Sequence, residues 1–121
     1  MKKKILIVDD SAMIRMQVRR ALQGAGFATE EATDGQDAYE KLSAKADVAL
    51  IVCDVNMPRM SGLELLERIH AESTTDAPVL MLTTEAQPEL IRQARSFGAR
   101  GWLVKPFKPD LLVAAVSKMA A

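Results

Sequence analysis

The chain has 121 residues, of which 49% are apolar and 26% are charged, and its formal net charge is zero. We expect residues 1–121 to form a single domain, because this length suits one compact core. Because basic and acidic residues are equal in number, the chain lacks the excess positive charge that is typical of nucleic-acid-binding proteins. No apolar stretch is long enough to span a bilayer, and the N-terminal apolar run is too short for a secretory signal. The one cysteine, Cys53, cannot form an internal disulfide, which favours a reducing cytoplasm.

Short apolar runs alternate along the chain with segments in which apolar residues recur at helical spacing. The short runs predict strands and the periodic segments predict helices. Strands are expected at 5–8, 28–32, 48–53, 78–82 and 102–104. Helices are expected over about 14–25, from 35, from 62, over 88–97 and across 112–119.

The clearest helix start is the sequence Ser61-Gly62-Leu63-Glu64. A serine followed three residues later by a glutamate is typical of a capping box, so the third helix should begin at Gly62. Its apolar spacing predicts that Leu63, Leu66 and Ile69 face the core.

The strict alternation of strands and helices indicates an α/β fold with a parallel sheet and helices on both faces. The strand at 28–32 reads ATEEA, which is polar enough for an edge, whereas the first, third and fourth strands are continuous apolar runs. The doubly wound, flavodoxin-like strand order 2-1-3-4-5 satisfies these constraints. Binding sites in such sheets form outside the carboxyl ends of the strands.

Charged and hydroxyl side chains follow four of these strands. Asp9 and Asp10 follow the first strand, Asp54 the third, Thr83 the fourth and Lys105 the fifth. Crowded carboxylates resist ionisation unless a positive charge lies close by. Three acids at one rim therefore predict a hard divalent cation, and oxygen ligands with room for water suit Mg²⁺.

Each residue also has a simpler interpretation. Asp10 or Ser11 could be the N-cap of the first helix. Asp54 could be a turn residue, and Lys105 could be an ordinary solvated side chain. The convergence of four strand ends favours a common site over four unrelated roles.

Four motifs, VDD, CDVNMPRMSG, LTTEA and GWLVKPF, occur in order along the chain. Together they resemble the receiver domain of two-component response regulators. The stretch MPRMSGLELLERI and the ending VKPF resemble the single-domain, chemotaxis-type (CheY-like) members most closely. The resemblance covers the whole chain.

The resemblance implies that Asp54 is the phosphorylated residue. It implies that Asp10 binds Mg²⁺ directly and that Asp9 binds it mainly through water. Asp54 and the backbone carbonyl of Asn56 would complete the protein's share of the metal ligands.

The resemblance also implies roles for residues in the second half of the chain. Lys105 would contact the phosphoryl group and Asp54, and the bond between Lys105 and Pro106 would be cis. Thr83 would hydrogen-bond the phosphoryl oxygens. Trp102 stands where the family usually has the tyrosine or phenylalanine of an aromatic switch, so its larger ring is a departure from the pattern.

In this family, side chains at the positions of Asn56 and Glu85 tune dephosphorylation. The implied phosphodonor is a sensor histidine kinase, and the implied output is binding of a target such as a motor switch component through the fourth helix, fifth strand and fifth helix. A phosphatase is a possible further partner, and we expect a monomer.

The sequence thus predicts a phosphorylation-activated signalling switch, which is not an enzyme beyond catalysing its own phosphotransfer and dephosphorylation. Two alternatives stay open. One is an Mg²⁺-dependent phosphatase with an aspartate nucleophile, although such enzymes carry an acid two residues after the nucleophile, where this chain has Asn56. The other is a receiver fragment of a larger transcriptional regulator.

Overall fold

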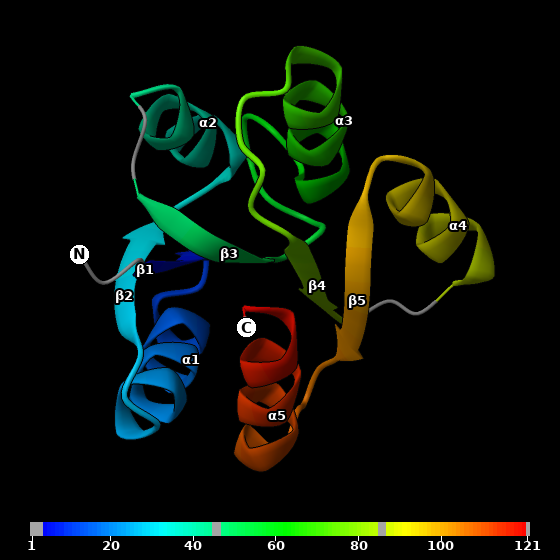
Figure 1. Ribbon diagram of the computed structural model, residues 1–121. Helices are drawn as coiled ribbons and strands as arrows, with labels where there is room; N and C mark the ends of the chain where they lie inside the picture. Colours follow the sequence, from blue (N-terminus) through cyan, green and yellow to red (C-terminus); the bar gives the residue numbers. More distant parts are fainter. Residues whose placement is uncertain (1–3, 45–46, 85–86, 121) are drawn as a thin grey trace.

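Strands and helices alternate along the whole of the computed structural model, which describes residues 4–44, 47–84 and 87–120 (Figure 1). The strands are β1 Lys4–Val8, β2 Ala28–Ala32, β3 Val48–Cys53, β4 Val79–Thr83 and β5 Ala99–Val104. The helices are α1 Ala12–Gly24, α2 Gly35–Ser43, α3 Gly62–Glu72, α4 Pro88–Ser96 and α5 Pro109–Met119. No helix among the described residues is long and apolar enough to cross a membrane.

The strands form one parallel sheet in the order β2-β1-β3-β4-β5, which confirms the predicted α/β topology. Val8 is in register with Cys53 on β3 and with Ala32 on β2, while Thr83 is in register with Val104 on β5. The last residues of neighbouring strands therefore lie side by side, and the loops that follow them meet at one edge of the sheet.

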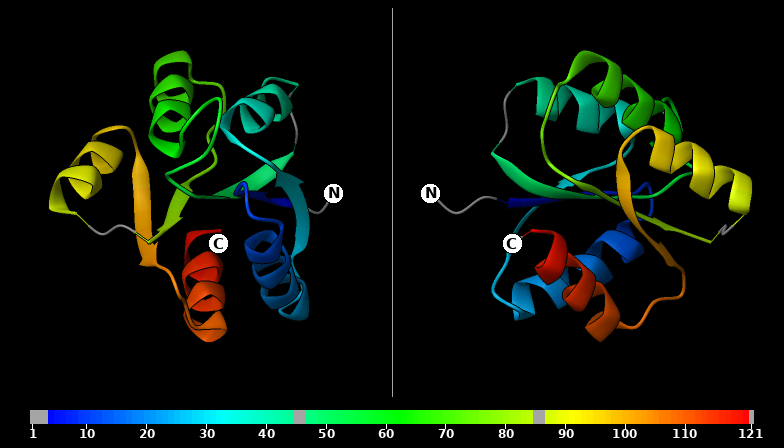
Figure 2. Two further views of the ribbon diagram at one scale, coloured as in Figure 1. Left: turned by 180° about the vertical axis from the view of Figure 1, so that it is seen from behind. Right: turned by 45° about the vertical axis from the view of Figure 1, so that its right-hand side comes forward.

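Helices cover both faces of the sheet, with α1 and α5 on one side and α2, α3 and α4 on the other (Figures 1 and 2). Two apolar cores result. Ile5, Val18, Leu22, Leu82 and Leu112 belong to the core under α1 and α5. The interior strands β1, β3 and β4 are almost wholly buried, whereas β2 and β5 are half-buried, as expected for edge strands.

The capping box predicted for α3 is present. Ser61 Oγ accepts a hydrogen bond from the Glu64 backbone N–H, and Glu64 Oε1 accepts one from the Ser61 N–H, both at 3.1 Å. The inward stripe differs from the prediction: Leu65, Leu66 and Ile69 are buried and Leu63 is only partly buried. The reason is that Gly62 is the first buried residue of the helix. Leu65 and Leu66 follow it by three and four positions, so they lie on the same buried face of the helix.

Three strands differ in their bounds from the sequence prediction, and β1 begins one residue early, at Lys4. Strand β5 begins at Ala99 and not at 102, because an edge strand needs no continuous apolar run and its first residues are small or charged. Strand β4 runs from Val79 to Thr83, so Thr83 is the last residue of the strand and does not follow it.

Candidate functional site

Four strands deliver polar side chains to the carboxyl edge of the sheet. The Asp54 backbone N–H donates to the Val8 carbonyl oxygen at 2.9 Å, which holds the residue after β3 beside the end of β1 and hence beside Asp9. The Lys105 N–H donates to the Thr83 carbonyl oxygen at 2.7 Å. These backbone bonds continue the sheet ladder by one residue and bring Asp9, Asp54, Thr83 and Lys105 together.

The three predicted acids form one cluster. Asp9, Asp10 and Asp54 each offer a carboxylate oxygen, and these oxygens all lie within 4.8 Å of one another. Asp9 and Asp54 are buried and Asp10 is exposed, so the cluster opens to solvent on the side of Asp10. Carboxylate oxygens at this spacing, with room for water, fit a hard divalent cation.

Lys105 supplies the positive charge within the cluster. Its Nζ lies 2.8 Å from Asp9 Oδ2 and 3.5 Å from Asp54 Oδ1, and its side chain is only 12% exposed. The ammonium group therefore bridges two buried carboxylates, and its closer partner is Asp9.

Two further hydrogen bonds hold Asp9 in place. Its Oδ1 accepts the Ser11 N–H at 2.9 Å, and its backbone carbonyl oxygen accepts Arg15 Nη1 at 2.6 Å. Ser11 is the N-cap of α1, with its hydroxyl accepting the Ile14 N–H at 3.3 Å. Asp10 is thus not the cap, and its carboxylate stays at the open side of the cluster.

The pKa of Asp54 is raised above that of an ordinary aspartate. Burial of the carboxylate is the main cause, and the neighbouring charge of Asp9 adds to it. The Lys105 ammonium and the Val55 N–H, which donates to Asp54 Oδ1 at 2.8 Å, oppose the rise. A cation bound between the acids would favour the ionised form of Asp54.

Gly62 lets α3 begin directly against the backbone of Asp54. A β-carbon at Gly62 would stand 2.0 Å from the Asp54 carbonyl oxygen, and the Gly62 N–H donates to the Val55 carbonyl oxygen at 2.8 Å. Only glycine allows this approach, so Gly62 determines how closely the helix supports the loop that carries Asp54.

An ion pair between the exposed Arg59 and the buried Asp34 ties this loop to the start of α2. Arg59, which has a left-handed φ of 62°, donates from Nε and Nη2 to the two carboxylate oxygens of Asp34 at 2.8 and 3.1 Å. The Gly35 N–H also donates to the Met60 carbonyl oxygen at 3.0 Å. The hydrogen bonds from Arg59 are the first cause of the lowered pKa of Asp34, which also caps α2 by accepting the Asp37 N–H.

Thr83 and Trp102 lie on the same face of the sheet. Trp102 is in register with Met81 on the neighbouring strand, and Met81 precedes Thr83 by two residues. Side chains two residues apart on a strand point to the same face of the sheet, so Thr83 and Trp102 share a face. Thr83 is fully buried, and Trp102 is partly buried against the core under α2, α3 and α4.

The remaining predicted site residues occupy the surrounding loops. Asn56 is exposed two residues after Asp54. The peptide bond between Lys105 and Pro106 is cis. Glu85 lies outside the described residues.

Sequence patterns did not reveal the residues that support the cluster. Arg15 and Glu31 lie on a helix and an edge strand that the sequence predicted, but nothing in their spacing indicated that Arg15 contacts both Glu31 and Asp9. The pair of Asp34 and Arg59 joins loops that are 25 residues apart. Such contacts depend on the tertiary arrangement, and single-sequence periodicity carries no signal for them.

Comparison with known proteins agrees with this arrangement. The family model described as the response regulator receiver domain matches residues 5–117. The chain therefore belongs to the response regulator receiver domain family, which acts in two-component signalling.

The similar proteins identify the type of receiver. Chemotaxis protein CheY-3 of Vibrio cholerae is 43% identical over 118 residues, which cover 96% of this chain and 90% of that protein. Chemotaxis protein CheY1 of Helicobacter pylori is 37% identical over 111 residues, which cover 90% of each chain. The solved structure of Vibrio cholerae chemotaxis protein CheY4 matches with a TM-score of 0.89 at 42% identity, and covers 98% of this chain and 99% of that chain. This chain is a receiver domain of the CheY type.

Proposed function

We propose that this protein is a phosphorylation-activated switch of a chemotaxis or motility pathway, and that Asp54 accepts the phosphoryl group. The observation that carries the proposal is the position of Asp54, buried next to two further carboxylates and 3.5 Å from the ammonium group of Lys105. This combination suits phosphoryl transfer, which depends on positioning and charge stabilisation more than on covalent help from the protein.

In the proposed reaction, a carboxylate oxygen of Asp54 attacks the phosphorus of a phosphohistidine on a sensor kinase. A new O–P bond forms as the P–N bond breaks, and the histidine nitrogen leaves with the electron pair. Lys105 offsets the negative charge that the incoming group brings to the site. The Val55 N–H, which donates to Asp54 Oδ1 at 2.8 Å, holds the attacking carboxylate in one orientation.

Asp10 and Asp54 would hold Mg²⁺ together with the carbonyl oxygen of Asn56, and Asp9 would act mainly through water. The carboxylate spacing of 4.8 Å or less fits such an ion. When bound, the ion would neutralise the acids and the transferring phosphoryl oxygens.

We further propose that the switch resets itself. Water would hydrolyse the acyl phosphate at Asp54, and the side chains of Asn56 and Glu85 would adjust the rate of that step. Asn56 is exposed at the edge of the site, where it can contact an incoming water. The domain would act on its own acyl phosphate only, with a separate phosphatase as a possible accelerator.

The output would run from Thr83 to the surface of α4, β5 and α5. The phosphoryl group adds nearly two negative charges and three acceptor oxygens, which the Thr83 hydroxyl would approach. Because Trp102 lies on the same face of the sheet as Thr83, movement of the threonine would change the space available to the indole ring. A target such as a motor switch component would bind the altered surface. We propose that the protein is a monomer in the cytoplasm, and the free Cys53 thiol is in keeping with that reducing compartment.

A phosphatase with an aspartate nucleophile is the less favoured function. Such an enzyme needs a general acid or base close to its nucleophile, and the residue two places after Asp54 is Asn56, which cannot transfer a proton in that way. Stoichiometric labelling supports the receiver, whereas repeated turnover of a generic phosphate ester would support the phosphatase.

The test is labelling of the Asp54→Asn variant by a phosphorylated sensor kinase in the presence of Mg²⁺. We expect no acid-stable, hydroxylamine-sensitive label on this variant, because the amide cannot form the acyl phosphate. Asp110→Asn is the matched control, since Asp110 is an exposed aspartate at the start of α5 and should be labelled like the wild type. Undiminished labelling of Asp54→Asn would refute the assignment.

A further inference from the structure

Arg15 contacts the acidic cluster from outside, through the backbone. Its Nη1 donates to the Asp9 carbonyl oxygen at 2.6 Å, while its Nε donates to Glu31 Oε1 on strand β2 at 3.0 Å. The side chain is only 15% exposed, so both bonds are largely shielded from water. One guanidinium group thus joins the turn after β1 to the edge strand of the sheet.

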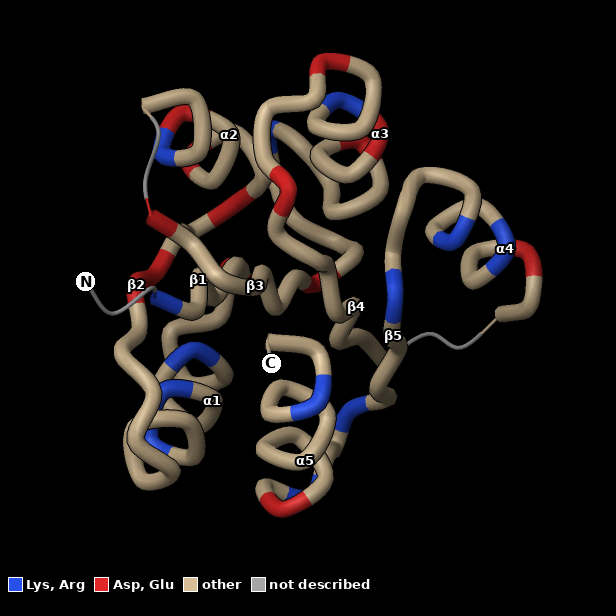
Figure 3. Tube along the Cα trace, in the orientation of Figure 1, with Lys and Arg blue, Asp and Glu red and all other residues tan. Residues whose placement is uncertain are grey.

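Glu31 is held in an orientation that suits this role. Its second oxygen accepts Arg19 Nη1 at 2.7 Å, and its backbone carbonyl oxygen accepts Lys41 Nζ at 2.6 Å. Burial of the Glu31 carboxylate opposes ionisation, but the hydrogen bonds and charges of Arg19 and Arg15 together outweigh it and lower the pKa of Glu31. Figure 3 shows the basic residues of α1 beside the acidic residues of β2.

Asp9 is consequently restrained on every side. Lys105 and the Ser11 N–H bind its two carboxylate oxygens at 2.8 and 2.9 Å, and its own N–H donates to the Ala32 carbonyl oxygen at 3.2 Å. The bond from Arg15 occupies the one remaining polar atom, the carbonyl oxygen. That carbonyl belongs to the planar peptide group that leads into Asp10, so its orientation fixes the backbone from which the Asp10 carboxylate projects.

We propose that Arg15 is a positioning residue for the metal site, oriented by Glu31 and acting through the Asp9–Asp10 peptide. This inference rests on the proposed function, because it assumes that the acidic cluster binds Mg²⁺. Groups that orient metal ligands commonly change metal affinity by tenfold or more when they are removed. The planar fork of arginine suits the task, because it can satisfy a carbonyl and a carboxylate at the same time.

Electrostatics and positioning predict opposite results for the loss of Arg15. Removing a positive charge near three carboxylates would strengthen Mg²⁺ binding if only long-range charge mattered. Loss of the bond to the Asp9 carbonyl would instead free the Asp9–Asp10 peptide and weaken binding. The direction of the change therefore separates the two effects.

The experiment is calorimetric titration of the phosphate-free protein with Mg²⁺. Arg15→Met keeps the aliphatic stem and the helix propensity but removes all donors, and we expect it to weaken Mg²⁺ binding about threefold to tenfold. Arg15→Lys keeps the positive charge but offers one ammonium group in place of the guanidinium fork. We expect it to bind Mg²⁺ more tightly than Arg15→Met and about twofold more weakly than the wild type.

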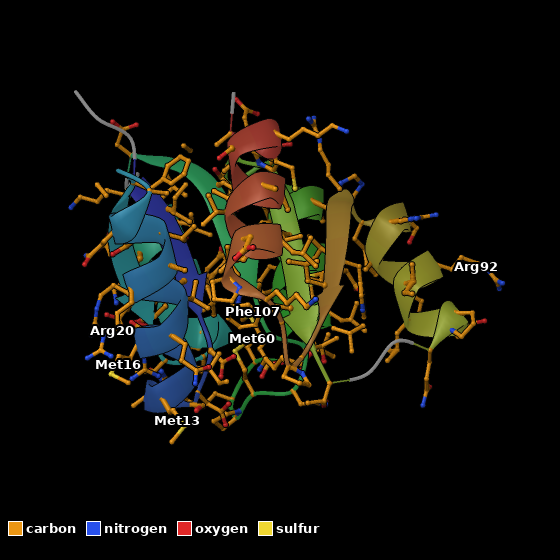
Figure 4. The ribbon with its side chains drawn as sticks, turned by 90° about the horizontal axis from the view of Figure 1, so that it is seen from below. Met13, Met16, Arg20, Met60, Arg92 and Phe107 are labelled. Atoms are coloured by element: carbon orange, nitrogen blue, oxygen red, sulfur yellow. The ribbon has the colours of Figure 1, made fainter. Side chains whose placement is uncertain are left out.

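Arg20→Met is the matched control, because Arg20 is exposed on the same helix, α1 (Figure 4). It removes one positive charge, as Arg15→Met does, and it should not weaken Mg²⁺ binding. A purely structural role for Arg15 would lower the urea midpoint of Arg15→Met and leave the Mg²⁺ affinity of the folded protein unchanged.

The inference is overturned if Arg15→Met binds Mg²⁺ as tightly as the wild type or more tightly, or if Arg20→Met loses as much affinity as Arg15→Met. Should Arg15→Met not fold, Arg15→Lys decides, and wild-type affinity in that variant overturns the inference. Absence of Mg²⁺ binding in the wild type would instead refute the proposed function itself.

Discussion

Replacing Gly62 with alanine should damage both the stability of the fold and the geometry of the site. The added β-carbon would meet the Asp54 carbonyl oxygen at 2.0 Å, the Asp54 carbonyl carbon at 2.9 Å and the Val55 Cα at 3.0 Å. All three atoms are backbone, so no side-chain rotation can relieve the overlap. To reach an allowed contact of about 3.0 Å, the start of α3 and the Asp54 carbonyl must separate by about 1 Å.

The cost can be worked from two contributions. Overpacking of a tightly packed site typically costs about 1–3 kcal/mol. The separation also strains the hydrogen bond from the Gly62 N–H to the Val55 carbonyl oxygen, which is 2.8 Å long and contributes about 1 kcal/mol. We therefore expect Gly62→Ala to lose about 2–4 kcal/mol of unfolding free energy, measured by urea denaturation. A displacement of about 1 Å at Asp54 should also slow its labelling by a small acyl phosphate by about 100-fold.

Gly24→Ala is the matched control for this experiment. Gly24 is the last residue of α1, and a β-carbon there would meet nothing within 4 Å. Alanine should stabilise the helix by up to about 1 kcal/mol and leave labelling unchanged. The reasoning is refuted if Gly62→Ala unfolds at the wild-type urea concentration and is labelled at the wild-type rate.

Three further predictions concern the loops and the switch. Asp34→Asn keeps the helix-capping oxygen but loses the ion pair with Arg59. Because the folded-state pKa of Asp34 is lowered, its ionised carboxylate stabilises the fold at pH values above the ordinary aspartate pKa. This stabilisation disappears as the pH falls through the lowered pKa. The unfolding free energies of wild type and variant, measured by urea denaturation at a series of pH values, should therefore converge in acid. If Asp34→Asn lost the same unfolding free energy at neutral and at acid pH, this prediction would be contradicted. Ser61→Ala removes the capping box with Glu64 and should cost about 1 kcal/mol in urea denaturation, whereas an unchanged midpoint would argue against the cap. Finally, Mg²⁺ should change the fluorescence of Trp102, the sole tryptophan, and an acyl phosphate should change it again; a flat response would leave the aromatic switch unsupported.

Several elements followed from local patterns alone. The continuous apolar run of β3 and the capping box before Gly62 predicted a buried strand and a helix start that the structure confirms. The alternation of strands with helices was enough to predict a parallel sheet, because consecutive parallel strands need a crossover connection. The polar composition of β2 was enough to place it at an edge.

The sequence by itself therefore determined the order of the elements, the strand order of the sheet and the set of polar residues at its carboxyl edge. These features are readable because hydrophobic periodicity and capping are local properties of the chain. Only the tertiary structure decided that Lys105 lies closer to Asp9 than to Asp54, that Arg15 reaches the Asp9 carbonyl from α1, and that Gly62 packs against Asp54. Each of these contacts joins separate elements at a distance set by the twist and packing of the whole sheet, and no short stretch of sequence encodes such a distance.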